Sequence, residues 1–124
     1  MTIADSDVLI EAMRGREPVV ALVGEMVANE SLATTSVSVF ELWSGAKTDR
    51  EKEKVRRLLT PLTVLSVDGS AAQQAASVRR ELEALGKTIG TADYLIAGIC
   101  LAHGMTLMTF NRKHFERVPG LVLA

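Results

Sequence analysis

Residues 1–10 read MTIADSDVLI, a short apolar run followed by two acids and then by a second apolar run. The run at 1–4 predicts a strand that ends at Asp5, and residues 7–13 predict a short helix. In parallel α/β sheets, functional sites form at the carboxyl ends of the strands. The opening of the chain therefore indicates an α/β fold and makes Asp5 a candidate functional residue.

Strand-like and helix-like segments alternate through the rest of the chain. The pattern predicts helices at 18–28, 38–46, 50–59, 71–85 and 92–103, and strands at 32–35, 62–67, 106–109 and 121–123. Strands that alternate with helices form a parallel sheet that is covered on both faces. We therefore expect an α/β protein with a central parallel sheet. The length of 124 residues predicts a single domain over residues 1–124.

The composition argues against several classes of protein. The net charge of −1 provides no general attraction to nucleic acid, so contact with a polyanion would depend on local patches or a metal ion. The single cysteine excludes an internal disulfide, and the apolar segment around Cys100 predicts a buried side chain in a reducing compartment. No signal peptide opens the chain, and no apolar run is long enough to cross a bilayer. These features predict a cytoplasmic protein without membrane contact.

Three acids in separate segments, Asp5, Glu41 and Asp93, are the strongest candidates for chemistry. Each lies among apolar residues beside the expected start of a helix. A carboxylate in such surroundings is poorly hydrated and needs a partner to remain ionised. A shared hard cation such as Mg²⁺ or Mn²⁺ would satisfy all three at once, because these ions prefer oxygen ligands. The three acids therefore suggest metal-assisted phosphodiester chemistry.

Two of these acids also have specific structural explanations. Asp5 could cap the following helix, although Ser6 can do that alone. Glu41 matches a capping box with Ser38 as the N-cap, in which the Glu41 carboxylate would accept a hydrogen bond from the backbone N–H of Ser38. For Glu41 the sequence leaves the choice between ligand and cap open.

Asp93 and Asp7 can be explained by helix dipoles. Asp93 follows Thr91, a plausible N-cap, and an acid in the first turn of a helix is stabilised by the macrodipole. Asp7 occupies the same kind of position in the first helix. The apolar segment that follows Asp93 nevertheless places this acid at the mouth of a buried helix, which favours a functional role.

The segment 109–115 reads TFNRKHF and follows an expected strand. Thr109 and Asn111 lie just beyond that strand, where their side chains could hydrogen-bond a phosphate or a water on a metal ion. The basic pair after Asn111 could contact phosphates or form a solvated face. His114 could be structural or could contact phosphate, and the two histidines of the chain are too isolated to predict a zinc site.

Taken together, the segments 5–10, 41–45, 93–97 and 109–115 resemble a PIN-domain ribonuclease of the VapC toxin type in their order, spacing and chain length. The resemblance implies a three-layer α/β/α sandwich around a central parallel sheet. It implies an endoribonuclease toxin that depends on Mg²⁺ or Mn²⁺, hydrolyses RNA phosphodiester bonds and is neutralised by a cognate antitoxin. We also expect a homodimer.

The resemblance assigns roles to individual residues. It implies that Asp5, Glu41 and Asp93 are the acids of the metal site and that Asn111 belongs to the catalytic set. Many PIN domains have a fourth acid where this chain has Asn111, so the binding of a second cation is in question. Asp7 stands where the family often has Asn, Thr or Ser and could partly replace the missing charge. Attack by water would leave 5′-phosphate and 3′-hydroxyl ends without using the RNA 2′-hydroxyl.

Three alternatives remain beside this interpretation. Asp5 and Asp7 after a strand also resemble the opening motif of haloacid-dehalogenase-type phosphatases, but the Lys and the later acidic pair of that family have no place here. A receiver-type signalling domain would use Asp68 as phospho-acceptor and leave Glu41 and Asp93 unexplained. A PIN domain that binds nucleic acid without cleaving it is the third, and Asn111 is its main support.

The aromatic residues around Glu41 suggest a partner surface. Phe40 and Trp43 are neighbours on one helix face, whereas Leu42 points elsewhere, so the three cannot enter one wall of the core. Trp43 either packs in the core or lines an apolar groove where an antitoxin segment docks.

Overall fold

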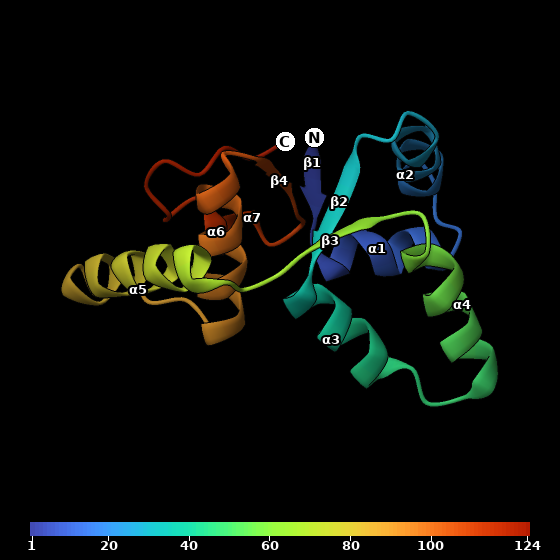
Figure 1. Cartoon of the computed structure of the whole chain (residues 1–124), viewed down its shortest axis with the longest axis horizontal. Coiled ribbons are helices and arrows are strands. Elements are labelled where there is room, and N and C mark those ends of the chain that lie inside the picture. The colour runs from blue at the N-terminus through green and yellow to red at the C-terminus, as the bar shows by residue number, and fades with distance from the viewer.

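A computed structural model describes residues 1–124 as four parallel strands and seven helices (Figure 1). The strands are β1 (Thr2–Ala4), β2 (Leu32–Thr35), β3 (Thr63–Leu65) and β4 (Thr106–Met108). The helices are α1 (Ser6–Met13), α2 (Val19–Ala28), α3 (Ser36–Gly45), α4 (Asp49–Leu59), α5 (Gly69–Ala84), α6 (Thr91–His103) and α7 (Arg112–Phe115). None of these helices combines the length and the apolar character needed to cross a bilayer.

The sheet has the strand order β3-β2-β1-β4, with every neighbouring pair parallel. Ile3 in β1 lies opposite Ala33 in β2 and Leu107 in β4. Parallel pairing brings the carboxyl ends of β1 and β4 to the same edge. The backbone N–H of Asp5, the first residue after β1, donates a hydrogen bond of 2.9 Å to the carbonyl of Met108.

Two hydrophobic cores lie on opposite faces of the sheet, because successive strand residues point to opposite faces. Ile3 belongs to the core shared with α5, α6 and α7, while the next residue, Ala4, belongs to the core shared with α1, α2, α3 and α4. Figure 1 shows α5 and α6 on one side of the strands and α1, α2 and α4 on the other. The predicted three-layer α/β/α sandwich with a parallel sheet is confirmed.

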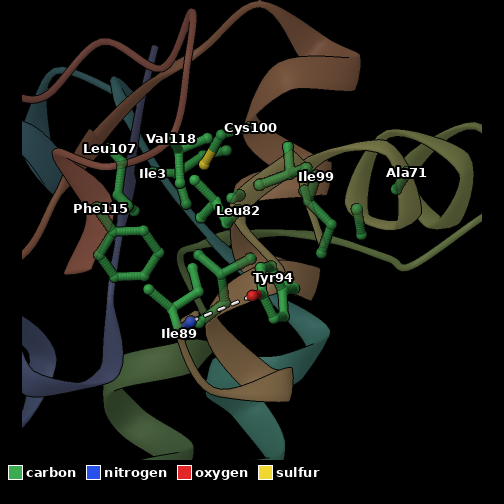
Figure 2. Packing of buried hydrophobic residues seen from close by; sticks show 14 of the residues in the cluster. Ile3, Ala71, Leu82, Ile89, Tyr94, Ile99, Cys100, Leu107, Phe115 and Val118 are labelled. Carbon is green, nitrogen blue, oxygen red and sulfur yellow. Dashed lines mark hydrogen bonds between the residues drawn. The ribbon is translucent and has the colours of Figure 1, made fainter. Parts of the chain in front are cut away.

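The core under α5 and α6 is built from aliphatic residues with few aromatic ones (Figure 2). Phe115 in α7 is fully buried against it. The hydroxyl of Tyr94 accepts a hydrogen bond of 3.2 Å from the backbone N–H of Ile89, which satisfies two polar groups inside the apolar layer. Cys100 is also fully buried, and its burial raises the pKa of the thiol to about 12. The predicted role of Cys100 as a buried apolar side chain is confirmed.

Several predicted helix boundaries are wrong. The helix expected to start at Ser38 begins at Ser36, because Thr35 at the end of β2 is the N-cap and its Oγ1 accepts from the Ser38 N–H at 3.1 Å. Thr91 is the first residue of α6 rather than its N-cap, which is Gly90. A Thr at the end of a strand is already in the extended conformation that an N-cap requires, so it takes the role ahead of Ser38.

The C-terminal segment also differs from the prediction. The strand expected at 121–123 is reduced to a single bridge between Leu123 and Leu107. Leu107 makes the hydrogen bonds of that bridge, donating to Val122 and accepting from Ala124. The short helix α7 was not expected, because four residues are too few to show a helical period.

Trp43 does not pack in the core. Its side chain is 39% exposed and that of Phe40 is 69% exposed, whereas Leu42 between them is buried. The interpretation of Trp43 as a core residue is therefore wrong. α3 turns Leu42 toward the sheet and leaves both aromatic residues on its outer face.

Gly98 marks the closest approach between α5 and α6. A Cβ at Gly98 would clash with the backbone carbonyl oxygen of Ala71 and would lie 2.7 Å from the Cβ of Ala75. Helix backbone cannot retreat without disturbing the whole layer, so Gly98→Ala is expected to reduce the free energy of unfolding by about 1–3 kcal/mol, measured by urea denaturation.

Gly24 provides the matched control for this substitution. It also lies inside a helix, α2, but a Cβ there would meet no atom within 4 Å. Gly24→Ala is expected to leave the free energy of unfolding unchanged or to raise it by up to about 1 kcal/mol, because alanine has the better helix propensity. Equal effects of the two substitutions would contradict the close helix contact at Gly98.

Candidate active site

Asp5 lies at the carboxyl end of β1 and is buried. It is the N-cap of α1, and its Oδ1 accepts a hydrogen bond of 2.8 Å from the backbone N–H of Ser6. Its Oδ2 accepts a hydrogen bond of 2.8 Å from the hydroxyl of Thr109, which follows β4. Asp5 therefore takes the capping role for which Ser6 was the alternative, and it also joins the ends of two neighbouring strands.

Asp7, in the first turn of α1, faces the same segment. Its Oδ2 accepts a hydrogen bond of 3.1 Å from the backbone N–H of Phe110 and lies 3.5 Å from the hydroxyl of Thr109. Its Oδ1 is buried and has no hydrogen-bond partner. A buried carboxylate oxygen without a donor is costly, so the position is one that a bound cation or water would stabilise.

Glu41 reaches this cluster from α3. The hydroxyl of Ser6 donates a hydrogen bond of 3.2 Å to Glu41 Oε1. The capping-box interpretation is wrong, because the N–H of Ser38 is bonded to Thr35 instead. Glu41 points toward α1 and does not cap its own helix.

Asp93, in the first turn of α6, makes contact with the segment after β4. Its Oδ2 lies 2.8 Å from Nδ1 of His114, and the same ring nitrogen lies 2.9 Å from Nδ2 of Asn111. The backbone N–H of Asn111 donates in turn to the hydroxyl of Thr109 at 3.0 Å. A chain of polar contacts therefore runs from Asp93 to the Thr109 hydroxyl that holds Asp5.

Burial raises the pKa of three of these carboxyl groups, and repulsion between acids adds to the shift in two of them. Burial raises the pKa of Asp5 to about 6; the Thr109 hydrogen bond opposes this shift, and repulsion from Asp7 and Glu41 adds to it. Burial also raises the pKa of Asp7, against the hydrogen bond from the Phe110 N–H. The pKa of Glu41 is raised by burial, with the Ser6 hydrogen bond opposing and repulsion from Asp93 and Asp7 adding. Four acids thus share one region.

No lysine or arginine forms a salt bridge with any of these four acids. The salt bridges of the arginines go to Glu11, Glu53, Glu83 and Glu116, and Asp93 has only the His114 ring. Carboxylate oxygens without cationic partners are the donor set of hard cations such as Mg²⁺ and Mn²⁺. The orphaned Asp7 Oδ1 is a further oxygen suited to such an ion. The residues present therefore fit a divalent cation.

The four carboxylates are not arranged as a complete coordination shell for a metal ion. No three His, Cys, Asp or Glu residues converge closely enough to form a metal centre as they are arranged here. A cation that bound among the carboxylates would have to draw them inward, and it would offset the repulsion between them.

The fold brings together all the residues proposed from the sequence, namely Asp5, Glu41, Asp93 and Asn111. Ser6 also takes part in the cluster, although the sequence indicated only a capping role for it. Its contact with Glu41 joins residues 35 positions apart, and no local pattern indicates it. Asp68 lies outside the cluster and caps α5, where its Oδ1 accepts from the Ala71 N–H at 2.9 Å, so the phospho-acceptor alternative has no support.

Known proteins resemble this chain in sequence and in fold. The family model for the PIN domain matches residues 2–121. Ribonuclease VapC10 of Mycobacterium tuberculosis is 36% identical over 124 residues, covering 98% of this chain and 90% of that protein. The tRNA(fMet)-specific endonuclease VapC of Shigella flexneri is 32% identical over 94 residues, covering 73% of this chain and 71% of that protein. The crystal structure of VapBC2 from Rickettsia felis, bound to a DNA fragment from its promoter, matches with a TM-score of 0.91 at 26% identity and covers 99% of this chain and 96% of that chain.

Proposed function

The chain belongs to the PIN-domain family, and we therefore propose that it is a metal-dependent endoribonuclease, the cytoplasmic toxin of a toxin–antitoxin pair. The observation that carries this proposal is the group of four carboxylates, Asp5 after β1 and one each from α1, α3 and α6, with which no lysine or arginine forms a salt bridge. Relatives that are more than 30% identical are named as a ribonuclease and a tRNA-specific endonuclease, which supports RNA as the substrate class.

We assign the cation, Mg²⁺ or Mn²⁺, to Asp5, Glu41 and Asp93, with Asp7 as a further carboxylate. A divalent cation bound there would supply Lewis acidity, which would make water more acidic and offset charge on the scissile phosphate. The protein's part is to hold the carboxylates in position. The Thr109 hydroxyl orients Asp5, and the Ser6 hydroxyl orients Glu41.

His114 and Asn111 complete the arrangement on the side of α6. The His114 ring holds the Asp93 carboxylate from the segment that follows β4.

Attack by water on the phosphorus expels the 3′-oxygen as a hydroxyl and leaves the phosphate on the 5′ side of the downstream fragment. The RNA 2′-hydroxyl takes no part in this route, so 2′-deoxy substitution at the cleavage site is expected to leave cutting intact.

The experiment that tests the function is cleavage of RNA by the purified chain. We expect cutting with Mg²⁺ or Mn²⁺, none with excess chelator, and fragments that carry 5′-phosphate ends by ligation-dependent sequencing. Binding of RNA without cutting at any concentration of either ion would favour the alternative, a PIN domain that binds nucleic acid without cleaving it.

Asn111 is the residue on which that alternative depends. Its side chain lies 2.9 Å from the His114 ring, next to Asp93, so a carboxylate there would add a charge to the same group. Asn111→Asp is therefore expected to tighten Mn²⁺ binding, measured by calorimetry, because an added anionic ligand favours a hard cation. Unchanged or weaker binding would place Asn111 outside the reach of the ion.

The partners proposed for this protein are a cognate antitoxin and a second copy of the chain. The outer face of α3 carries the exposed Trp43 and Phe40, and Phe40 lines an apolar hollow with Val37 and Leu95. Trp43 does not line that hollow, so its part in docking would be direct contact on the helix face. The homodimer stays a prediction, to be checked by light scattering of the purified chain.

Trp43→Ala tests the antitoxin surface. Interface anchors of this kind contribute about 2 kcal/mol or more to binding, so we expect the affinity for the cognate antitoxin to fall by that amount. Because Trp43 is 39% exposed, the melting temperature and RNA cleavage should change little. A sharp fall in melting temperature with unchanged partner affinity would contradict this assignment.

A further inference from the structure

Phe110 is a large apolar side chain held in the open beside the acids. Its ring is 54% exposed, and it lies between Thr109 and Asn111, two members of the polar network. Its backbone N–H is bound to Asp7 Oδ2 at 3.1 Å. The backbone on both sides is therefore fixed by hydrogen bonds to the site. Single exposed apolar residues are common, so the position of this one rather than its exposure calls for an explanation.

A hollow of about 550 Å³ opens next to the Phe110 ring. Five residues line the hollow: Phe110 and Ile10 are apolar, while Asp7, Glu11 and Arg14 are charged. Asp7 belongs both to this lining and to the carboxylate group, so the hollow is contiguous with the proposed site of cleavage. A flat apolar group that entered it would lie against Phe110 and Ile10 and stay within reach of polar partners.

Two arginines lie beside Glu11, one of the residues that line the hollow. Glu11 is paired with Arg16 at 3.0 Å, and Arg14 lies 4.0 Å from the same carboxylate oxygen. The two guanidinium groups balance the charges of Glu11 and Asp7, so the edge of the hollow carries no net charge. Both arginines are largely exposed and can turn toward a phosphate.

Single-stranded RNA offers the group that fits this arrangement. Its bases splay out of the strand and stack on exposed aromatic side chains, while its phosphates follow basic residues. We propose that Phe110 and the hollow beside it form a stacking subsite for one base of the RNA substrate, next to the scissile phosphate. The inference rests on the proposed ribonuclease function and names a residue that orients the substrate of that site.

Binding of a short single-stranded RNA of mixed sequence tests the subsite. The full chain with Asp5→Asn serves as the parent, so that the RNA is not consumed. We expect Phe110→Ala and Phe110→Leu to weaken binding about tenfold by fluorescence anisotropy, since stacking on one aromatic side chain contributes roughly that factor or more. Phe110→Tyr should bind within about twofold of the parent. Leucine keeps much of the apolar area without the ring, so the comparison separates stacking from apolar contact.

A second readout reports stacking directly. In an RNA that carries 2-aminopurine, the fluorescence of that base should change when the parent binds, because the base leaves its neighbours in the strand, and should change much less with Phe110→Leu. Leu85→Ala provides the control, because Leu85 is 61% exposed at the end of α5, a helix that extends away from the sheet (Figure 1). This control should match the parent in both measurements.

Each other outcome overturns the inference in a distinguishable way. Equal RNA affinity and an equal change in fluorescence for the parent, Phe110→Ala and Phe110→Leu would remove Phe110 from the substrate path but leave a metal-dependent nuclease intact. Weakened binding of the antitoxin with unchanged RNA binding would reassign Phe110 to a protein interface. Failure of the unmodified chain to bind or cut RNA would overturn the proposed function together with the subsite.

Discussion

Asp5→Asn is expected to abolish RNA cleavage and, in chelator, to make the folded protein more stable at neutral pH. Asp5 joins β1 to β4 through Thr109 and is buried beside Asp7 and Glu41. Asparagine removes one ligand charge from the proposed cation site, so the cation binds poorly and cutting should fall below detection. It also removes a negative charge that is poorly hydrated and repelled by its neighbours.

The gain in stability should depend on pH. Burial raises the pKa of Asp5 from 3.8 to about 6, so between these values the folded chain retains a proton that the unfolded chain has lost. The free energy of unfolding therefore falls as the pH rises through this range. The whole loss, which is reached above pH 6, is on the order of 3 kcal/mol. The advantage of Asp5→Asn over the unmodified chain should be largest above pH 6 and should vanish below about pH 4.

Urea denaturation in chelator across this pH range measures the effect. Asp68→Asn is the matched control, since Asp68 also caps a helix after a strand but has no part in the acid cluster. It should change neither cleavage nor the pH profile. Asp93→Asn should also abolish cleavage, because it removes another ligand charge, while asparagine keeps an oxygen that can contact His114. Cutting at wild-type rates by Asp5→Asn and Asp93→Asn would refute the assignment of the site.

Glu41→Gln carries the second large expected effect. Glutamine retains an oxygen that can accept the Ser6 hydroxyl but has no charge for a cation. Changes to the neighbours of a metal ligand typically cost 10–100-fold in affinity or activity, so loss of a ligand charge should reduce cleavage by about 100-fold or more. The free energy of unfolding should stay nearly the same, because Thr35 and not Glu41 caps α3.

A glutamate on another helix controls for this substitution. Glu25 is exposed on α2, and Glu25→Gln should leave cleavage and stability unchanged. Weaker Mn²⁺ binding of Glu41→Gln by calorimetry would support the ligand role independently of turnover. Full activity of Glu41→Gln would instead limit Glu41 to its contact with Ser6.

The amino-acid sequence determined the layers of this fold and the candidate acids. Alternating strand and helix patterns predicted the parallel sheet, and strand β2 falls at the predicted residues 32–35. Asp5 was recognisable because it follows an apolar run and precedes a helical one. Such features depend on neighbours in the chain, since side-chain periodicity and capping act over a few residues.

Only the tertiary structure decided which residues meet at the site. Thr109 holds Asp5 across 104 positions and Ser6 holds Glu41 across 35, while Trp43 is left outside the core that takes Leu42. These contacts follow from the strand order β3-β2-β1-β4, which sets the end of β4 beside the end of β1. Periodicity shows which face of an element is buried but not which element lies next to it, because pairing depends on how all the helices pack against both faces of the sheet.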